Sequence, residues 1–244
     1  MTGIRFGASQ YFNPRHLPSL ACWYDASDVN ANSSNPSDGT ALSSWKDKSR
    51  NANNASQGTG ASQPLFKTNI ANGLPGILFD GSNDFMSGAT SGTMGITSSP
   101  YEIYVVASSS SSAFQFITSC ATAGRFEISL NVLVGASFLP NSTSTPITTD
   151  IGTASQYTDG VPHIFSGRVE SDASNTFYVR VDSTDGGSPV ASGLSSTNNN
   201  FIMGYRGNVS FPFSGYIFEL VVCATQLRAE QRTALATYFK RWGI

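Results

Sequence analysis

The chain has 244 residues, of which only 12% are charged, and its formal net charge at pH 7 is -2. A single β-sandwich domain of this length buries roughly 70 to 75% of the surface of its unfolded chain, so we expect one domain. The nearly balanced charge supplies no basic field for nucleic acid or for an anionic membrane, and we expect neither as a partner.

The first 18 residues predict an irregular N-terminal arm. Asn13-Pro14 and Leu17-Pro18 interrupt regular structure, and the arm could lie over the domain or reach a neighbouring molecule. The start of the chain lacks the basic residues and apolar run of a signal peptide, and no stretch approaches the roughly 18 apolar residues of a membrane span. We therefore expect an arm at 1–18, a folded domain at 19–244, and a protein made and kept in a cytoplasm or released by lysis or assembly.

Short stretches with mostly alternating or continuous apolar residues predict the strands, and polar loops separate them. In chain order these stretches are 20–24, 74–79, 101–107, 126–134, 163–169, 177–181, 201–205 and 215–223. Many short strands without intervening helices are typical of two antiparallel sheets packed face to face.

The last strand and the segment after it predict the closing piece of the fold. Residues 215–223 are apolar on both faces, with Phe218 and Leu220 on the same face, and only Glu219 interrupts them. Such a strand is expected to be central and covered on both sides. The period then becomes helical over 227–242, which predicts the only convincing helix of the chain.

Six motifs, in order along nearly the whole chain, carry a family resemblance. They are Trp23-Tyr-Asp-Ala-Ser-Asp28, Trp45-Lys-Asp-Lys-Ser49, Asn72-Gly-Leu-Pro75, Phe79-Asp-Gly-Ser-Asn-Asp84, Gly215-Tyr-Ile-Phe-Glu219 and the segment Leu227 to Gly243. The chain resembles the concanavalin A-like lectin/glucanase superfamily, in its laminin-G-like branch. The resemblance implies an all-β, two-sheet antiparallel jelly-roll sandwich with one C-terminal α-helix. Arg228 stands where the family usually has Ser, so Gln231 is left to form half of a capping box.

Glucanases of this superfamily cleave sugars with two carboxylates, and retaining enzymes hold them about 5 to 5.5 Å apart. The nearest acidic cluster here, Glu170-Ser-Asp172, has a turn-like composition, and Glu102, Glu127 and Glu219 are isolated acids on separate predicted strands. We expect no enzymatic activity.

The histidines and cysteines do not form a recognisable site. His16 and His163 have no Cys or carboxylate at ligand spacing, which leaves a zinc site or a catalytic triad without support. We interpret His163 as a residue at the edge of a strand. Cys22, Cys120 and Cys223 are far apart and predict three buried thiols.

Asp80, Asn83 and Asp84 place three oxygen-bearing side chains within five residues. They could ligate Ca²⁺, as in some lectin-like and laminin-G-like relatives. The alternative, which we favour, is a tight turn made by hydrogen bonds from the backbone to these side chains. Apart from Ca²⁺, no cofactor is expected.

Sugar binding requires an exposed aromatic ring beside amide groups on loops. Tyr157, Tyr205, Asn198 and Asn200 are the candidate ligand-binding residues, although the sequence does not show that they converge.

Two functions follow from these observations. Domains of this type resemble those of bacteriophage virion proteins, and the chain has no room for a fibre shaft, so our leading hypothesis is a capsid decoration or cement protein. It would contact the major capsid protein or other virion proteins, form a homo-oligomer and reside in the virion after synthesis in the host cytoplasm. The alternative is a carbohydrate-binding or host-receptor module.

Overall fold

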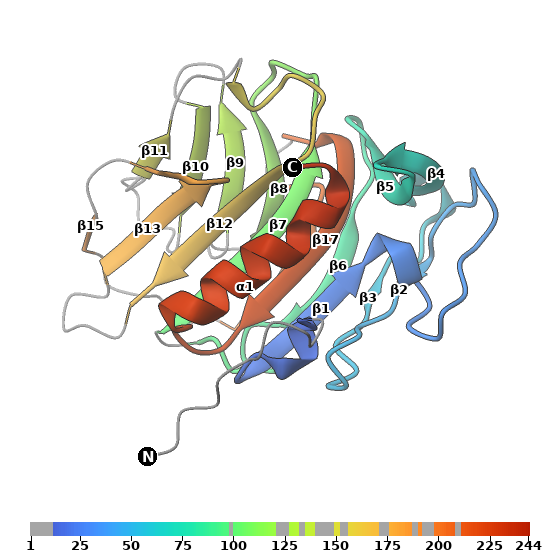
Figure 1. Cartoon of the computed structure of the whole chain (residues 1–244). Helices are drawn as coiled ribbons and strands as arrows, with labels where there is room; N and C mark the ends of the chain where they lie inside the picture. The colour runs from blue at the N-terminus through green and yellow to red at the C-terminus, as the bar shows by residue number, and fades with distance from the viewer. Residues whose placement is uncertain are drawn as a thin grey trace.

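The computed structural model describes residues 12–97, 100–120, 127–131, 135–139, 149–151, 156–170, 176–186, 190–191, 198–207 and 211–244. Two antiparallel β-sheets pack face to face, and the single α-helix of these residues, near the C-terminus, covers one of them (Figure 1). The predicted all-β jelly-roll sandwich with one C-terminal helix is confirmed. No helix in the described part of the chain is long and apolar enough to span a membrane.

The sheet beneath the helix, called here the helix-side sheet, has nine strands in the order β14-β13-β12-β7-β17-β5-β4, with β1 added to β17 and β15 to β13. Their bounds are β1 Leu20–Asp25, β4 Leu65–Ala71, β5 Leu74–Asp80, β7 Tyr101–Ser108, β12 His163–Val169, β13 Thr176–Val181, β14 Thr184–Asp185, β15 Val190–Ala191 and β17 Ser214–Cys223.

The opposite sheet has eight strands in the order β11-β10-β9-β8-β16-β6-β3-β2. Their bounds are β2 Ser44–Trp45, β3 Ala55–Ser56, β6 Met86–Thr90, β8 Gln115–Cys120, β9 Glu127–Asn131, β10 Gly135–Leu139, β11 Thr149–Ile151 and β16 Asn200–Met203. The single long strand that we expected over 126–134 is wrong. Asn131 instead pairs with Gly135 across the antiparallel pair β9 and β10, and Gly135 has a φ of 75°, which glycine adopts without strain.

Strand β17 is the centre of the helix-side sheet. It pairs with β7 along one edge, while β5 and β1 share its other edge. Its predicted central, doubly covered position is confirmed. A register shift between Ile217 and Glu219 places Ile217 in the core and Phe218 on the helix side, 5.3 Å from the ring of Trp242. Our expectation that Phe218 shares a face with Leu220 is therefore wrong, because a bulge puts neighbouring residues on the same side.

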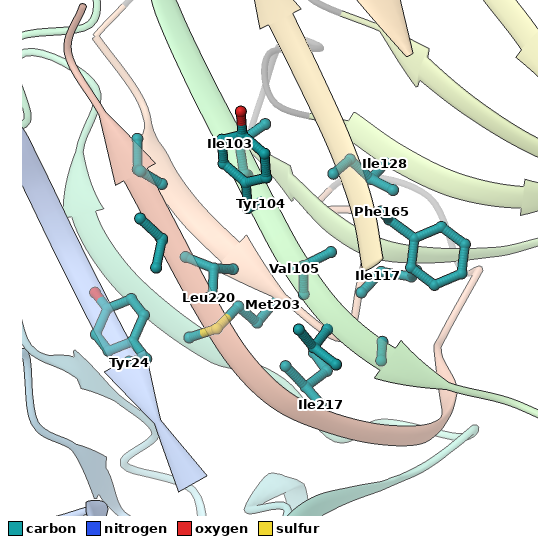
Figure 2. Close-up of a cluster of buried hydrophobic side chains, with 14 of the residues drawn as sticks. Tyr24, Ile103, Tyr104, Val105, Ile117, Ile128, Phe165, Met203, Ile217 and Leu220 are labelled. Carbon is teal, nitrogen blue, oxygen red and sulfur yellow. The ribbon is translucent and has the colours of Figure 1, made fainter. Parts of the chain in front are cut away.

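The hydrophobic core lies between the sheets and is formed by the inward-facing side chains of both (Figure 2). Val105, Leu220 and Phe165 come from the helix-side sheet, and Ile128 and Met203 come from the opposite sheet. The three cysteines are buried, as predicted.

Gly167 of β12 allows one close contact between the layers. A Cβ atom at Gly167 would lie 2.3 Å from the ring of Phe138, which belongs to β10 of the opposite sheet. Only a residue without a side chain lets the ring approach this closely.

The helix α1 runs from Ala229 to Phe239 and continues as the 3-10 turn η5 (Lys240–Trp242). The backbone N–H of Arg228 donates to Oε1 of Gln231 at 2.9 Å, which is the predicted half of a capping box. Gly243 ends the segment in the left-handed conformation, with a φ of 88°.

The C-terminal end of the helical segment is held by Glu219 of β17, whose side chain is completely buried. Trp23 donates its indole N–H to Oε1 at 2.7 Å, and Trp242 donates to Oε2 at the same distance. The Arg241 guanidinium lies 2.6 Å from Oε2 and 2.9 Å from a carboxylate oxygen of Asp25. One carboxylate thus joins β1, β17 and η5.

The N-terminal end of α1 is held in the same way by Glu102 of β7, which is also completely buried. Its carboxylate accepts the backbone N–H of Leu227 at 2.8 Å and lies 2.6 Å from Nη2 of Arg232. Tyr104 donates its hydroxyl to the other carboxylate oxygen at 2.5 Å. Two buried acids therefore fix both ends of α1 on the sheet.

The described part of the N-terminal arm lies on the domain. It contains the 3-10 turn η1 (Pro14–His16), and Nε of Arg15 donates to the Lys48 carbonyl at 2.8 Å. The ring of Phe12 is 6.0 Å from that of Tyr238 on α1. Two further 3-10 turns, η2 (Ala26–Asp28) and η3 (Gly60–Ser62), lie in connecting segments. Residues 1–11 of the arm lie outside the described residues.

Replacing Glu219 by alanine is expected to lower the free energy of unfolding by about 3 to 5 kcal/mol, because it leaves Arg241 and two indole N–H groups without their buried acceptor. Urea denaturation followed by tryptophan fluorescence measures the loss. The control is Glu230→Ala on the exposed face of α1, where an ion pair contributes at most about 1 kcal/mol. Equal losses for the two variants would contradict the role assigned to Glu219.

Candidate functional site

The outer face of the helix-side sheet is only partly covered by α1. The helix crosses β7 and β17, while β12 and β13 lie beside it (Figure 1). Phe165 and Val169 of β12 point into the core, so the alternate residues Ser166 and Arg168 point outward. The same alternation turns Tyr178 of β13 outward. These polar side chains form the floor of an open site beside the helix.

A cavity of about 690 Å³ occupies this position, and we call it the α1 groove. The floor is formed by Tyr104, Ser166, Arg168, Tyr178, Arg180 and Asp182. The wall on the helix is formed by Ala229, Arg232, Thr233, Ala236, Thr237 and Lys240, which recur at helical spacing. Ala and Thr are short, so this flank of α1 does not fill the space over β12 and β13. The volume lies in the range of small-ligand sites, about 300 to 1,000 Å³.

The arginines on the floor of the α1 groove form ion pairs with nearby carboxylates. Nε of Arg168 lies 3.1 Å from Glu170, and its guanidinium sits 4.1 Å above the ring of Tyr178. Arg180 lies 2.9 Å from the carboxylate of Asp185 and donates to the carbonyls of Asp182 and Ser183. These contacts orient the two guanidinium groups to different degrees, because Nε of Arg168 is buried without a hydrogen bond, whereas the side chains of Arg180 and Asp185 are 47% and 73% exposed.

The cations on the helix wall differ from each other. Arg232 is bound to Glu102. Burial lowers the pKa of Arg232, but the hydrogen bonds and the charge of Glu102, with smaller contributions from other groups, outweigh it and raise the pKa above the ordinary value. Lys240 is exposed at the end of α1, and no described carboxylate lies within ion-pair distance of it. The groove therefore combines three arginines that are paired with carboxylates and one exposed lysine at its margin for which no described carboxylate is close enough to pair.

His163 connects one end of the groove, at Asp182, to Asp159 in the segment before β12. Its Nδ1 lies 2.7 Å from Asp182 and its Nε2 3.2 Å from Asp159. Burial lowers the pKa of His163, but the hydrogen bonds and charges of the two aspartates outweigh it and raise the pKa above the ordinary value. The interpretation of His163 as the first residue of a strand is confirmed.

The predicted ligand-binding residue Tyr157 packs inside the domain. Its side chain is only 7% exposed, and its ring lies 5.4 Å from that of His163 and 6.2 Å from that of Phe165. The ring is thus occupied by protein contacts near the groove end.

The other three predicted ligand-binding residues lie on the opposite sheet. Tyr205 contacts Phe85 just before β6, with ring centroids 5.9 Å apart. Asn198 accepts the N–H of Gly92 beyond the other end of β6, and Asn200 donates to Ser87. The strand between Phe85 and Gly92 separates Tyr205 from Asn198, so the structure does not bring these residues together in one site.

The predicted calcium-binding residues form the turn after β5. Oδ1 of Asp80 accepts the backbone N–H groups of Ser82 at 2.8 Å and Asn83 at 3.2 Å, and Oδ2 of Asp84 accepts that of Asp80 at 3.0 Å. Asn83 donates its amide to the Ala61 carbonyl. This is the turn geometry that we favoured, and calcium binding stays a prediction. No cluster of three or more His, Cys, Asp and Glu residues suited to a metal occurs in the described residues.

The three isolated acids occupy different environments. Glu102 and Glu219 fix α1, as described above. Glu127 of β9 lies 3.0 Å from Arg206, while its Oε2 is buried without a hydrogen-bond partner, and burial raises its pKa. None of these contacts joins two of the acids, and the expectation of no enzymatic activity stays a prediction.

No protein-family model matches the chain, and no curated protein sequence matches it. Solved structures do. Domain 4 of AbnA, a GH43 extracellular arabinanase from Geobacillus stearothermophilus, in complex with arabinotriose, has a TM-score of 0.56 and 16% identity, with coverage of 89% of this chain and 98% of that domain. The CBM40 of the Ruminococcus gnavus IT-sialidase, bound to α2,3 sialyllactose, has a TM-score of 0.51 and 16% identity, with coverage of 66% and 96%.

A third similar structure is the Trypanosoma rangeli sialidase in complex with sialic acid, at a TM-score of 0.57 and 12% identity. The match covers 91% of this chain and 33% of the sialidase, so this chain corresponds to about a third of that enzyme. At these identities the likeness shows the β-sandwich fold alone.

Sequence reasoning missed the residues of the α1 groove. The alternation of Arg168, Tyr178 and Arg180 with core residues identifies a polar outer face on 163–169 and 177–181. That pattern is equally typical of a solvated surface. The missing information was the path of α1, which turns one part of this face into a groove.

Replacing His163 by glutamine is expected to destabilise the protein more at about pH 5.5 than at about pH 8.5. A pKa raised by folding means that the protonated histidine contributes stability below its unfolded pKa, and this contribution is lost as pH rises through the folded pKa. Urea denaturation of both proteins at each pH gives the difference. His16→Gln, at an exposed position, is the control. A difference independent of pH would show that the charged histidine is not stabilising.

Proposed function

We propose that this chain is a non-catalytic carbohydrate-binding module that holds a saccharide in the α1 groove. The observation that carries the proposal is the groove itself, an open cavity lined by guanidinium and carboxylate groups that are paired with one another. Sugar hydroxyls both donate and accept hydrogen bonds, and a site that offers both kinds of group can satisfy them.

The polar groups of the groove supply both roles. Arg168 and Arg180 are donors only, whereas Asp182 and Asp185 are acceptors. Ala229, Ala236 and Ile164 supply apolar surface for the C–H faces of a sugar ring. The hydroxyls of Thr233 and Thr237 donate to helix carbonyls at 3.0 and 2.8 Å, so they face the groove mainly with their methyl groups and acceptor lone pairs.

The similar structures support a saccharide as the ligand class. Domain 4 of AbnA is in complex with arabinotriose and the CBM40 is bound to sialyllactose, so sandwiches of this fold bind sugars in two proteins. The capsid decoration hypothesis stays a prediction, because neither these neighbours nor the described contacts bear on a virion partner.

Thr233→Trp tests the site. Thr233 is exposed on the wall of the groove, and an indole there would occupy the space proposed for the ligand without disturbing the core. Binding to a saccharide identified on a glycan array is expected to weaken at least about tenfold, equivalent to about 1.4 kcal/mol, when measured by calorimetry.

The matched control is Glu230→Trp, which places the same side chain on α1 at an exposed position outside the groove. This variant should bind like the unmodified protein. An array without any bound glycan would refute the carbohydrate function, while undiminished binding by Thr233→Trp would place the site elsewhere on the molecule.

A further inference from the structure

We infer that the α1 groove selects neutral saccharides over acidic ones, an inference that rests on the proposed carbohydrate function. It follows from how the charges around the groove are paired. The groove alone presents more cations than anions, which would suggest an anionic ligand. The acids directly behind its lining reverse that conclusion.

The lining cations are balanced in number when the acids that pair with the lining arginines are counted as well. The lining contains four cations, Arg168, Arg180, Arg232 and Lys240, and two anions, Asp182 and Asp185. Glu170 and Glu102, which hold Arg168 and Arg232, add two more anions. Four positive and four negative charges leave these eight groups with a formal net charge of zero.

The arginine charges also balance pair by pair. Three of the four cations have a carboxylate within 3.1 Å, at Glu170 for Arg168, Asp185 for Arg180 and Glu102 for Arg232. Glu170 is itself oriented, because it accepts the side-chain N–H of Gln226 at 3.1 Å. Of the four groove-lining cations, Lys240 at the margin of the groove is the one for which no described carboxylate lies within ion-pair distance.

These pairs penalise an acidic ligand. A carboxylate or sulfate group that approached Arg168 or Arg180 would compete with the acid already bound there and would be repelled by it. It would also lose hydration on entering the groove without gaining an unpaired arginine in return. A neutral hydroxyl avoids both costs, because it can bond to the free N–H groups and carboxylate lone pairs without separating an ion pair.

The test uses a glycan array that contains neutral oligosaccharides together with the same oligosaccharides carrying a uronic acid or a sulfate. Neutral glycans are expected to bind, and the added acidic group should weaken binding at least about fivefold. The affinity of the neutral ligand should change less than about twofold between about 0.05 and 0.5 M NaCl, because no net charge is neutralised.

Three results are distinguishable. Neutral glycans that bind better than their acidic counterparts support both proposals. Acidic glycans that bind better overturn the neutral selectivity but leave the carbohydrate function intact. An array on which no glycan binds refutes the carbohydrate function, and the selectivity with it.

A pair of substitutions tests the cause of the selectivity. Glu170→Gln combined with Asp185→Asn removes the partners of Arg168 and Arg180 and raises the net charge of the site by two. This protein should recover binding to the acidic glycan at least about fivefold relative to the neutral one. Glu230→Gln combined with Asp38→Asn makes the same charge change at exposed positions outside the groove and should not alter the preference. Equal behaviour of the two double variants would overturn the assignment to these ion pairs.

Discussion

The architecture depends on the completely buried carboxylate of Glu219. Glu219 sits in the middle of the central strand and accepts hydrogen bonds from Trp23, Trp242 and Arg241, which come from both ends of the chain. An acid in this position is costly unless every neighbour satisfies it, so the surrounding segments have little freedom to pack differently. Glu219, the acid that interrupts the apolar last strand, therefore determines where the C-terminal end of the helical segment packs.

The position of α1 determines what the other half of the sheet can do. Glu102 contacts the first turn and Glu219 contacts the end of the helical segment, and together they hold the helix across β7 and β17. The short side chains Ala236 and Thr237 then face an open space over Tyr178 and Arg180. The groove is thus a consequence of packing at two anchors outside its own floor.

Sequence periodicity predicted the layers of this fold much better than it predicted the site. The apolar pattern located β1, β5, β7, β12, β13 and β17, because a strand buried on one face has alternating apolar residues and a strand buried on both faces has a continuous apolar run. It failed at Phe218, where a bulge shifts the faces, and at Gly135, where two strands replace one. Tyr157 looked like an exposed sugar platform, yet it packs against His163. The groove residues are recognisable only once non-local contacts place α1, and no local pattern encodes that placement.

Arg232 contributes to the stability of the fold and also lies in the proposed binding site. Arg232 lines the groove and also bonds the buried Glu102 that anchors the first turn of α1. A ligand that drew Arg232 away from Glu102 would leave this buried carboxylate without its cation, which is energetically unfavourable. Ligands that use the remaining N–H groups of Arg232 and leave its pair intact bind without this cost. The need to keep the helix in place is therefore a second argument for the neutral selectivity that we propose for the groove.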